Sequence, residues 1–169
     1  MTGVQTCALP IYDKIDVLRE TGRAVDFVVA MPADALDELL RALPPEFCVD
    51  PQARMELFTG TMRWVVEVKG AELKLEFFLL GGDPHHAEEF ARRRRQWLPD
   101  AAVEASVATA EDLIIQKLRW ARAKDLEDIR GILSLQSSAL DFPCIEKWCD
   151  IHGTRARLDE LRRSIPPDL

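Results

Sequence analysis

The sequence is poor in the residues that build metal sites and disulfide frameworks. Its 169 residues include four cysteines and three histidines. The cysteine spacing matches no zinc pattern, and the pair His85 and His86 is not expected to bind a metal. Nothing suggests a secretory signal, so reduced thiols in a cytoplasmic protein are expected. The cysteines are Cys7, Cys48, Cys144 and Cys149.

Long apolar runs and an excess of positive charge are also missing. No run approaches the roughly 20 residues that a bilayer-spanning helix needs. The net charge of −7 and the pI near 5.0 argue against a general nucleic-acid-binding surface, although they leave room for a local basic groove. Hydrophobic residues make up 47% and charged residues 30% of the chain, enough for one domain with a sizeable core.

The first residues, MTGVQTCALPI, resemble a translated sequencing adapter. Residues 1–11 are therefore expected to be an artefactual leader, and the authentic gene is expected to be missing its beginning. Residues 12–108 are predicted to form a truncated α/β core, whose first segment, 12–20, is a weak helix candidate. Residues 109–169 are predicted to form a helical region packed on that core.

The core pattern predicts a small mixed sheet with helices packed on it. Strands are expected at residues 25–31, 47–49 and 103–108, and a hairpin at 61–69 and 72–80. Helices are expected at 33–43, at 51–58 after the capping pair Asp50 and Pro51, and at 85–98. With a C-terminal helical cluster, this order indicates an α+β fold.

The helical region carries clear start and stop signals. The stretch 108–133 is expected to form a capped helix, a short basic turn and a second helix. Thr109 with Asp112 forms an acidic variant of the capping box, and Asp125 is expected to cap the second helix. Asp141 should cap a third helix that ends at residues 152–153, and Thr154 a last one through residue 165.

Lys117 is a charged residue where the helical period predicts a hydrophobic one. Leu113, Ile114, Leu118 and Ala121 fall on the same face of the first helix, and Lys117 lies inside that arc. Lysines are rarely fully buried unless they are paired. Either Lys117 extends to the rim of the face, or its ammonium points into a cleft that requires positive charge.

Two further charged features have alternative interpretations. Glu76 lies on a strand face that becomes apolar at Phe78 and Leu80, which places it at a sheet margin or in a cleft. The run RRRR at residues 92–95 is typical of a solvated helix face with one or two ion pairs. Contact with phosphate or tRNA is the alternative interpretation of that run.

The order and spacing of several motifs resemble one bacterial family. The motifs are VDFVVAMP, KLEFFLLGGDP, EEFARRRR, EDLIIQKL and KDLEDIRGIL, and the resemblance covers roughly residues 24–165. Together they resemble minimal nucleotidyltransferase-fold proteins of the polymerase-β-like superfamily. These include abortive-infection toxin nucleotidyltransferases and related domains of unknown function.

The resemblance implies transfer of a nucleotidyl group from an NTP to a hydroxyl acceptor with Mg²⁺. Asp26 matches the second residue of the Asp-x-Asp pair and Glu76 the third carboxylate, so both are expected metal ligands and catalytic residues. Lys117 matches a lysine of catalytic and nucleotide-binding role, and Asp128, with Asp125, an acidic residue of the nucleotide site.

The match is incomplete at two points. Ala24 stands where the first aspartate should be, and the Gly-Ser turn that holds the triphosphate would lie upstream of it, where no such turn is found. Catalysis is therefore expected to be impaired. The alternatives are an enzyme acting on RNA or protein, and a non-catalytic degenerate fold that binds a nucleotide, a partner protein or nothing. A toxin–antitoxin role rests on family analogy alone.

Overall fold

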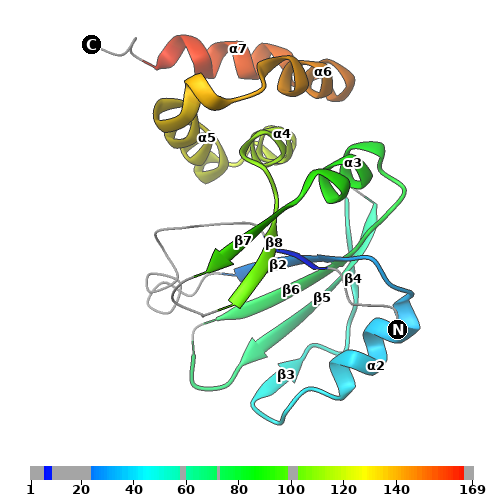
Figure 1. Ribbon diagram of the computed structural model, residues 1–169. Coiled ribbons are helices and arrows are strands. Elements are labelled where there is room, and N and C mark those ends of the chain that lie inside the picture. Colours follow the sequence, from blue (N-terminus) through cyan, green and yellow to red (C-terminus); the bar gives the residue numbers. More distant parts are fainter. Residues whose placement is uncertain (1–5, 9–23, 58–59, 72, 99–102, 166–169) are drawn as a thin grey trace. The chain divides into compact units, whose positions relative to one another are not determined.

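The computed structural model describes residues 6–8, 24–57, 60–71, 73–98 and 103–165 (Figure 1). The helix predicted for residues 12–20 and the expected upstream turn lie outside the described residues. The chain divides into two compact units, residues 1–108 and 109–169. The first unit contains the sheet and the second contains helices, so the α+β prediction is confirmed.

The sheet of the first unit is mixed. Its order is β3-β5-β6-β2-β1-β8-β7, with β4 paired to β5. Strands β2 and β6 are parallel, as are β1 and β8, and the other pairs are antiparallel. The strands are β1 (Thr6–Ala8), β2 (Ala24–Val29), β3 (Phe47–Val49), β4 (Arg54–Glu56), β5 (Thr61–Val68), β6 (Lys74–Leu79), β7 (Arg94–Leu98) and β8 (Val103–Val107).

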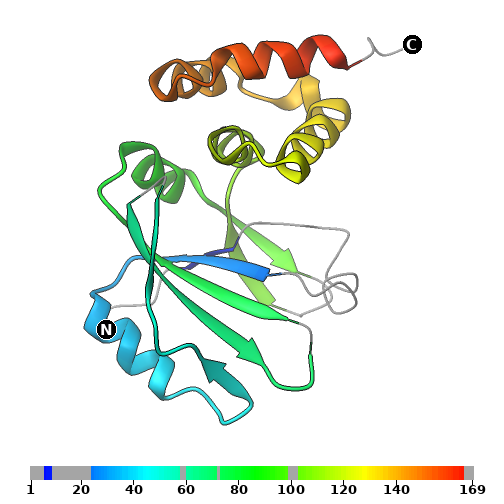
Figure 2. The ribbon, with the colours of Figure 1, turned by 180° about the vertical axis from the view of Figure 1, so that it is seen from behind.

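One face of this sheet packs against α2 (Ala33–Arg41), which Figure 2 shows beside the strands. Leu36 and Leu40 of this amphipathic helix are buried, with Val29, Trp64 and Val66 of the sheet. The indole nitrogen of the tryptophan also donates to the Asp37 carboxylate, 2.9 Å away. Pro44 and Pro45, which follow the helix, cannot continue it.

The opposite face is apolar only in part. Val28 and Phe78 pack with Phe90 of α3 (Pro84–Arg92) in a second buried cluster. Asp83 caps this helix by accepting a hydrogen bond from the backbone N–H of His86 at 3.0 Å. Because side chains alternate along strands, the residues two positions before Val28 and Phe78 share this face.

Two predicted helices are wrong. The helix expected at 51–58 does not form in the described residues 51–57, because Arg54–Glu56 pairs with β5 as strand β4. The helix expected at 85–98 ends at Arg92, and β7 follows as an antiparallel partner of β8. Thr6–Ala8, inside the expected leader, pairs with β2 and β8, and the origin of that segment stays a prediction.

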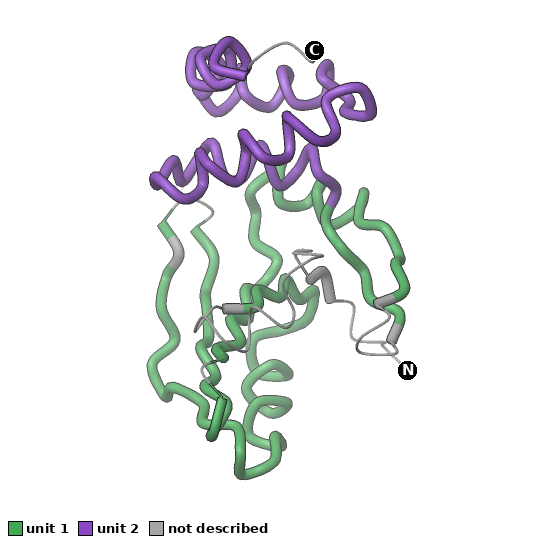
Figure 3. Tube along the Cα trace, turned by 90° about the vertical axis from the view of Figure 1, so that its left-hand side faces the viewer, with its two compact units in different colours: residues 1–108 green, residues 109–169 purple. Residues whose placement is uncertain are grey.

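The second unit, coloured separately in Figure 3, is a cluster of helices around one core. It comprises α4 (Ala110–Trp120), α5 (Ala123–Gln136), the 3₁₀ turn η1 (Ser137–Ala139), α6 (Phe142–His152) and α7 (Arg155–Ser164). Arg157 ties α7 to α4 by donating to the Leu118 carbonyl at 2.9 Å. The fully buried core residues are Ile114, Ile115, Leu118, Ile129, Ile145, Cys149 and Leu158.

Most predicted helix ends of this unit are confirmed. The Thr109 hydroxyl accepts from the Asp112 backbone N–H at 3.3 Å, and Asp141 accepts from the N–H of Cys144 at 3.1 Å. Gly153 ends α6 with φ +68°, a left-handed conformation that glycine adopts without strain. The cap predicted at Asp125 is wrong, because α5 begins one turn earlier.

Replacing Thr109 with alanine is expected to lower the free energy of unfolding by about 1 kcal/mol, because the substitution removes the cap of α4. Urea unfolding followed by circular dichroism measures the change. Ser134→Ala is the matched control, since its hydroxyl bonds to a carbonyl within an exposed helical turn and its loss should change stability by less than about 0.5 kcal/mol. Equal effects would argue against capping.

No helix among the described residues is both long and apolar enough to cross a bilayer.

Candidate functional site

The register of β2 and β6 brings two predicted site residues together. Asp26 pairs with Glu76 in this parallel ladder, so both lie on one face of the sheet, on strands about 4.8 Å apart. They stand two residues before Val28 and Phe78, beside the apolar cluster under α3. The polar part of this face therefore begins where the buried core ends.

Glu76 is held by an arginine that was not among the predicted site residues. Nη1 of Arg63, on β5, lies 2.9 Å from Oε2 of Glu76. The guanidinium also lies 5.9 Å from the centre of the Phe78 ring. Because only 17% of the Glu76 side chain is exposed, this ion pair is partly shielded from water. The carboxylate is thus already neutralised within the sheet.

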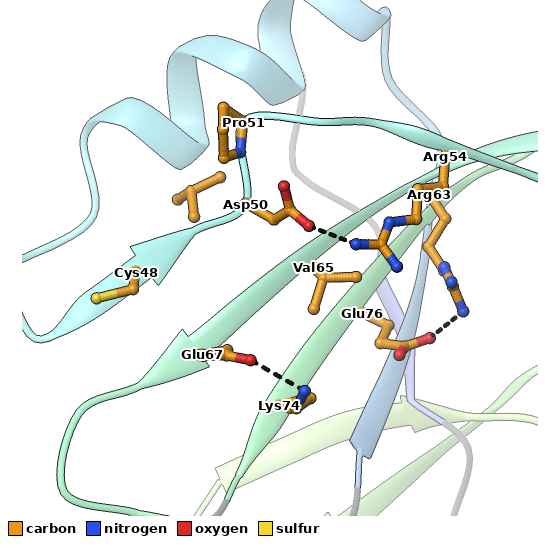
Figure 4. Close-up of a pocket in the computed structure, with 10 residues that line it drawn as sticks. Cys48, Asp50, Pro51, Arg54, Arg63, Val65, Glu67, Lys74 and Glu76 are labelled. Atoms are coloured by element: carbon orange, nitrogen blue, oxygen red, sulfur yellow. Dashed lines mark hydrogen bonds and ion pairs between the residues drawn. The ribbon is translucent and has the colours of Figure 1, made fainter.

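A pocket of about 340 Å³ opens in front of this ion pair (Figure 4). Of the two interpretations of Glu76, the structure supports a position in a cleft. Two more ion pairs line the pocket, each with a contact of 2.9 Å: Asp50 with Arg54, and Glu67 with Lys74. The charged groups of the lining are therefore three cations and three carboxylates. Cys48, Val49, Pro51 and Val65 complete it.

Asp50 is fixed by the turn that precedes β4. Its Oδ1 accepts the backbone N–H of Gln52 at 2.9 Å, while Oδ2 holds Arg54 at the same distance. The backbone hydrogen bond, aided by the arginine charge, lowers the pKa of Asp50 below its ordinary value. The carboxylate is therefore a charged anchor for Arg54 at neutral pH.

Lys117 lies in a group of charges within the second unit. Its Nζ is 2.6 Å from Oδ2 of Asp128 and 3.9 Å from Oδ1 of Asp125, and 18% of its side chain is exposed. The lysine that interrupts the apolar face is therefore balanced by carboxylates of the next helix. Its expected approach to the sheet carboxylates stays a prediction.

Asp125 is the buried member of this group. Its side chain is fully shielded and accepts from Nε, Nη2 and the backbone N–H of Arg122, at 2.6, 3.0 and 3.1 Å. Burial raises the pKa of Asp125, but the hydrogen bonds from Arg122 and the charges of Arg122 and Lys117 outweigh it, so the pKa lies below its ordinary value. Asp125 is the third residue of α5, and its carboxylate binds the backbone N–H of Arg122, the residue that precedes the helix.

The carboxylates of Asp26 and Glu76 do not form a complete set of ligands for Mg²⁺ in this structure. The ion favours several oxygen ligands, and Asp26 and Glu76 supply carboxylates from two strands. Glu76, however, is paired with the Arg63 guanidinium, and position 24 adds no carboxylate. Across the part of the chain that the structure describes, no three His, Cys, Asp or Glu side chains gather as a metal site.

The arginine run does not act as a single surface. Arg92 ends α3 and pairs with Glu88 at 2.8 Å, and Arg95 pairs with Glu104 across β7 and β8 at 2.6 Å. These ion pairs agree with the interpretation of the run as a solvated surface with one or two ion pairs. Part of the run, however, lies on strand β7 and not on a helix. His85 and His86 are buried on α3.

Comparison with known proteins gives structural neighbours but no family. No protein-family model matches the sequence, and no curated protein is significantly similar to it. JHP933 from Helicobacter pylori has a TM-score of 0.41 and 15% identity, over 85% of this chain and 68% of its own. Another protein of that organism, described as a candidate nucleotidyltransferase, has a TM-score of 0.44 and 16% identity, over 96% and 79%. Overlap of this extent leaves the function to be argued from the chain's own residues.

Proposed function

We propose that this chain is a nucleotidyltransferase-like protein that binds a nucleotide beside Asp26 and Glu76 without transferring it. The ligand class comes from the sequence resemblance. The loss of transfer is supported by the 2.9 Å ion pair between Arg63 and Glu76, which is the observation that carries the proposal. A carboxylate that is hydrogen-bonded to a guanidinium binds a metal ion less strongly, because its charge is already partly neutralised.

Catalysis is the second candidate function. It is favoured by the in-register pairing of Asp26 with Glu76, since two carboxylates on neighbouring strands can bind one Mg²⁺ ion. When bound, the metal would supply charge for the phosphates and activate the attacking hydroxyl of an RNA or protein acceptor. Lys117 and Asp128 would then belong to the nucleotide site, and a cognate partner protein would be consistent with a toxin–antitoxin role.

An aspartate placed at position 24 distinguishes a nucleotide-binding protein that does not catalyse transfer from a catalyst. Ala24→Asp alone is expected to give no Mg²⁺-dependent transfer, because Arg63 still neutralises Glu76. Adding Arg63→Met should raise Mg²⁺ affinity about tenfold over the single variant, since a charged hydrogen bond no longer competes for Glu76. Calorimetry measures Mg²⁺ binding, and labelled NTPs incubated with RNA and protein report transfer.

The matched control is Ala24→Asn with Arg63→Met, which has the shape of the double variant without the new charge. Equilibrium dialysis of the unaltered chain with labelled ATP, GTP, CTP and UTP tests binding directly. Transfer by the unaltered chain would show that the protein is an enzyme. Failure to bind any of the four nucleotides, with or without Mg²⁺, would overturn the nucleotide-binding proposal.

A further inference from the structure

Two arginines face the pocket beside Glu76 from neighbouring strands (Figure 4). The antiparallel register of β4 and β5 sets Arg54 directly opposite Arg63 on one face. Residues in such positions have Cβ atoms about 4.5–5.5 Å apart, and like charges there repel. Asp50 and Glu76 already offset part of this repulsion, and an anion in front of the two guanidiniums would offset more of it.

The two guanidiniums have donors to spare. Arg63 gives Nη1 to Glu76, while its Nε is shielded from water and has no hydrogen-bond partner among the described residues. Arg54 gives Nη2 to Asp50. A guanidinium carries several N–H donors in a planar fork, so one carboxylate contact leaves others available. Because Nε of Arg63 is shielded, the outer Nη groups are the donors that a ligand oxygen can reach.

Both arginines are also held in place before any ligand arrives. Glu76 and the Phe78 ring fix Arg63, and Asp50 fixes Arg54. Asp50 is itself held by the backbone N–H of Gln52. Groups that are already ordered lose little conformational entropy on binding, so the geometry favours a bound anion.

We propose that Arg54 and Arg63 form a phosphate-binding subsite that holds the nucleotide in the absence of magnesium. This inference rests on the proposed nucleotide-binding function. The planar fork of arginine matches phosphate oxygens, and the open pocket of about 340 Å³ leaves room for a phosphate group in front of the two guanidiniums. In this site the guanidiniums supply the positive charge that magnesium supplies in the family that the sequence resembles.

The nearby carboxylates set the strength of this subsite. Glu76 competes with a phosphate for Arg63, so its charge limits the affinity. Glu67 and Lys74 are 61% and 52% exposed, and such a solvated pair contributes little. The phosphate contact should therefore be of modest affinity and should weaken as salt screens it.

Calorimetric titration of the full chain in EDTA tests the subsite with ATP, inorganic tripolyphosphate and adenosine as probes. ATP and tripolyphosphate should bind, and adenosine should bind at least tenfold more weakly. Glu76→Gln should strengthen ATP binding several-fold, because it removes the competing charge but keeps the shape. Arg63→Met with Glu76→Gln should weaken it about tenfold relative to Glu76→Gln alone.

The double variant removes both charges of the ion pair, so its loss of binding relative to Glu76→Gln is not caused by an uncompensated charge on the sheet. Arg95→Met, at an ion pair on β7, is the control and should leave ATP binding unchanged. Binding of ATP that requires Mg²⁺ and is unaffected by loss of Arg63 would overturn the subsite and leave nucleotide binding intact. Absence of ATP binding under every condition would overturn both.

Discussion

Replacing Asp125 with alanine is expected to lower the free energy of unfolding of the helical unit by about 3 kcal/mol. The carboxylate is fully buried and accepts three hydrogen bonds from Arg122, two from the side chain and one from the backbone. Removing it deletes the contacts that hold Arg122 at the start of α5 and leaves Lys117 with one carboxylate fewer. Urea unfolding followed by circular dichroism at 222 nm, the usual helix signal, measures the loss.

Asp128→Ala is the matched control for this substitution. Asp128 is also bound to Lys117, at 2.6 Å, but its side chain is 47% exposed. Exposed ion pairs contribute at most about 1 kcal/mol, so the loss should be clearly smaller. Similar losses for the two variants would mean that burial of Asp125 adds nothing to its ion pairs.

The Asp125 carboxylate also makes the stability of the helical unit depend on pH, and the direction of its pKa shift gives the sign of that dependence. Its folded-state pKa lies below the ordinary value of 3.8, so the stability it adds is complete above that value. The contribution is lost as the pH falls through the lower, folded-state pKa. The difference in free energy between the unaltered chain and Asp125→Asn should therefore be constant near neutral pH and should shrink in acid below the ordinary value.

Leu36→Ala should destabilise the sheet unit by about 2–5 kcal/mol. Leu36 is fully buried on α2, with Val29, Trp64 and Val66 around it, and its loss leaves a cavity on the face opposite the pocket. Thermal and urea unfolding monitored by tryptophan fluorescence reports the change, since Trp64 belongs to the same cluster.

Leu39→Ala, three residues along the same helix, is the control for the cavity. Its side chain is 38% exposed, so its truncation should cost less than about 1 kcal/mol. Alanine is the better helix former, so helix propensity cannot explain a loss, and a comparable loss for both leucines would show that burial of Leu36 against the sheet is not the dominant contribution of α2.

The helical unit was the most predictable part of the chain, because its signals are local. Thr109 and Asp141 are polar residues directly before apolar periods, and both cap helices as expected. Gly153 likewise marks the end of α6. The position of Asp125 was misjudged because a carboxylate at the third helical residue gives the same sequence signal as one at the cap.

The wrong helices in the sheet unit have a different cause. The segment around the arginine run contains good helix formers and no breaker until Pro99, yet its second half pairs with β8. Asp50 and Pro51 have the sequence pattern of a helix start, but the Asp50 carboxylate accepts the backbone N–H of Gln52 in a turn before β4. Pairing between distant segments overrides local propensity, and a single sequence does not reveal it.

The candidate site was visible in outline only. Asp26 and Glu76 were singled out by the resemblance, and the structure sets them in register. The contact with Arg63 was missed because it depends on the register of the hairpin, which places Arg63 opposite Phe78 and therefore diagonal to Glu76. The alternation of Arg63, Val65 and Glu67 along β5 was the signal that would have put an arginine on this face.

The arginines of β7 have a consequence for how copies of this protein meet in a crowded solution. β7 ends the sheet order among the described strands, and an end strand offers unpaired backbone groups to any other extended chain. Arg94 and Arg95 are exposed along it, beside the exposed ring of Trp97. Arg94 would repel the same residue of a second copy at this edge, while Arg95 is already balanced by Glu104, so edge-to-edge stacking of two such sheets would be opposed by one charge per strand.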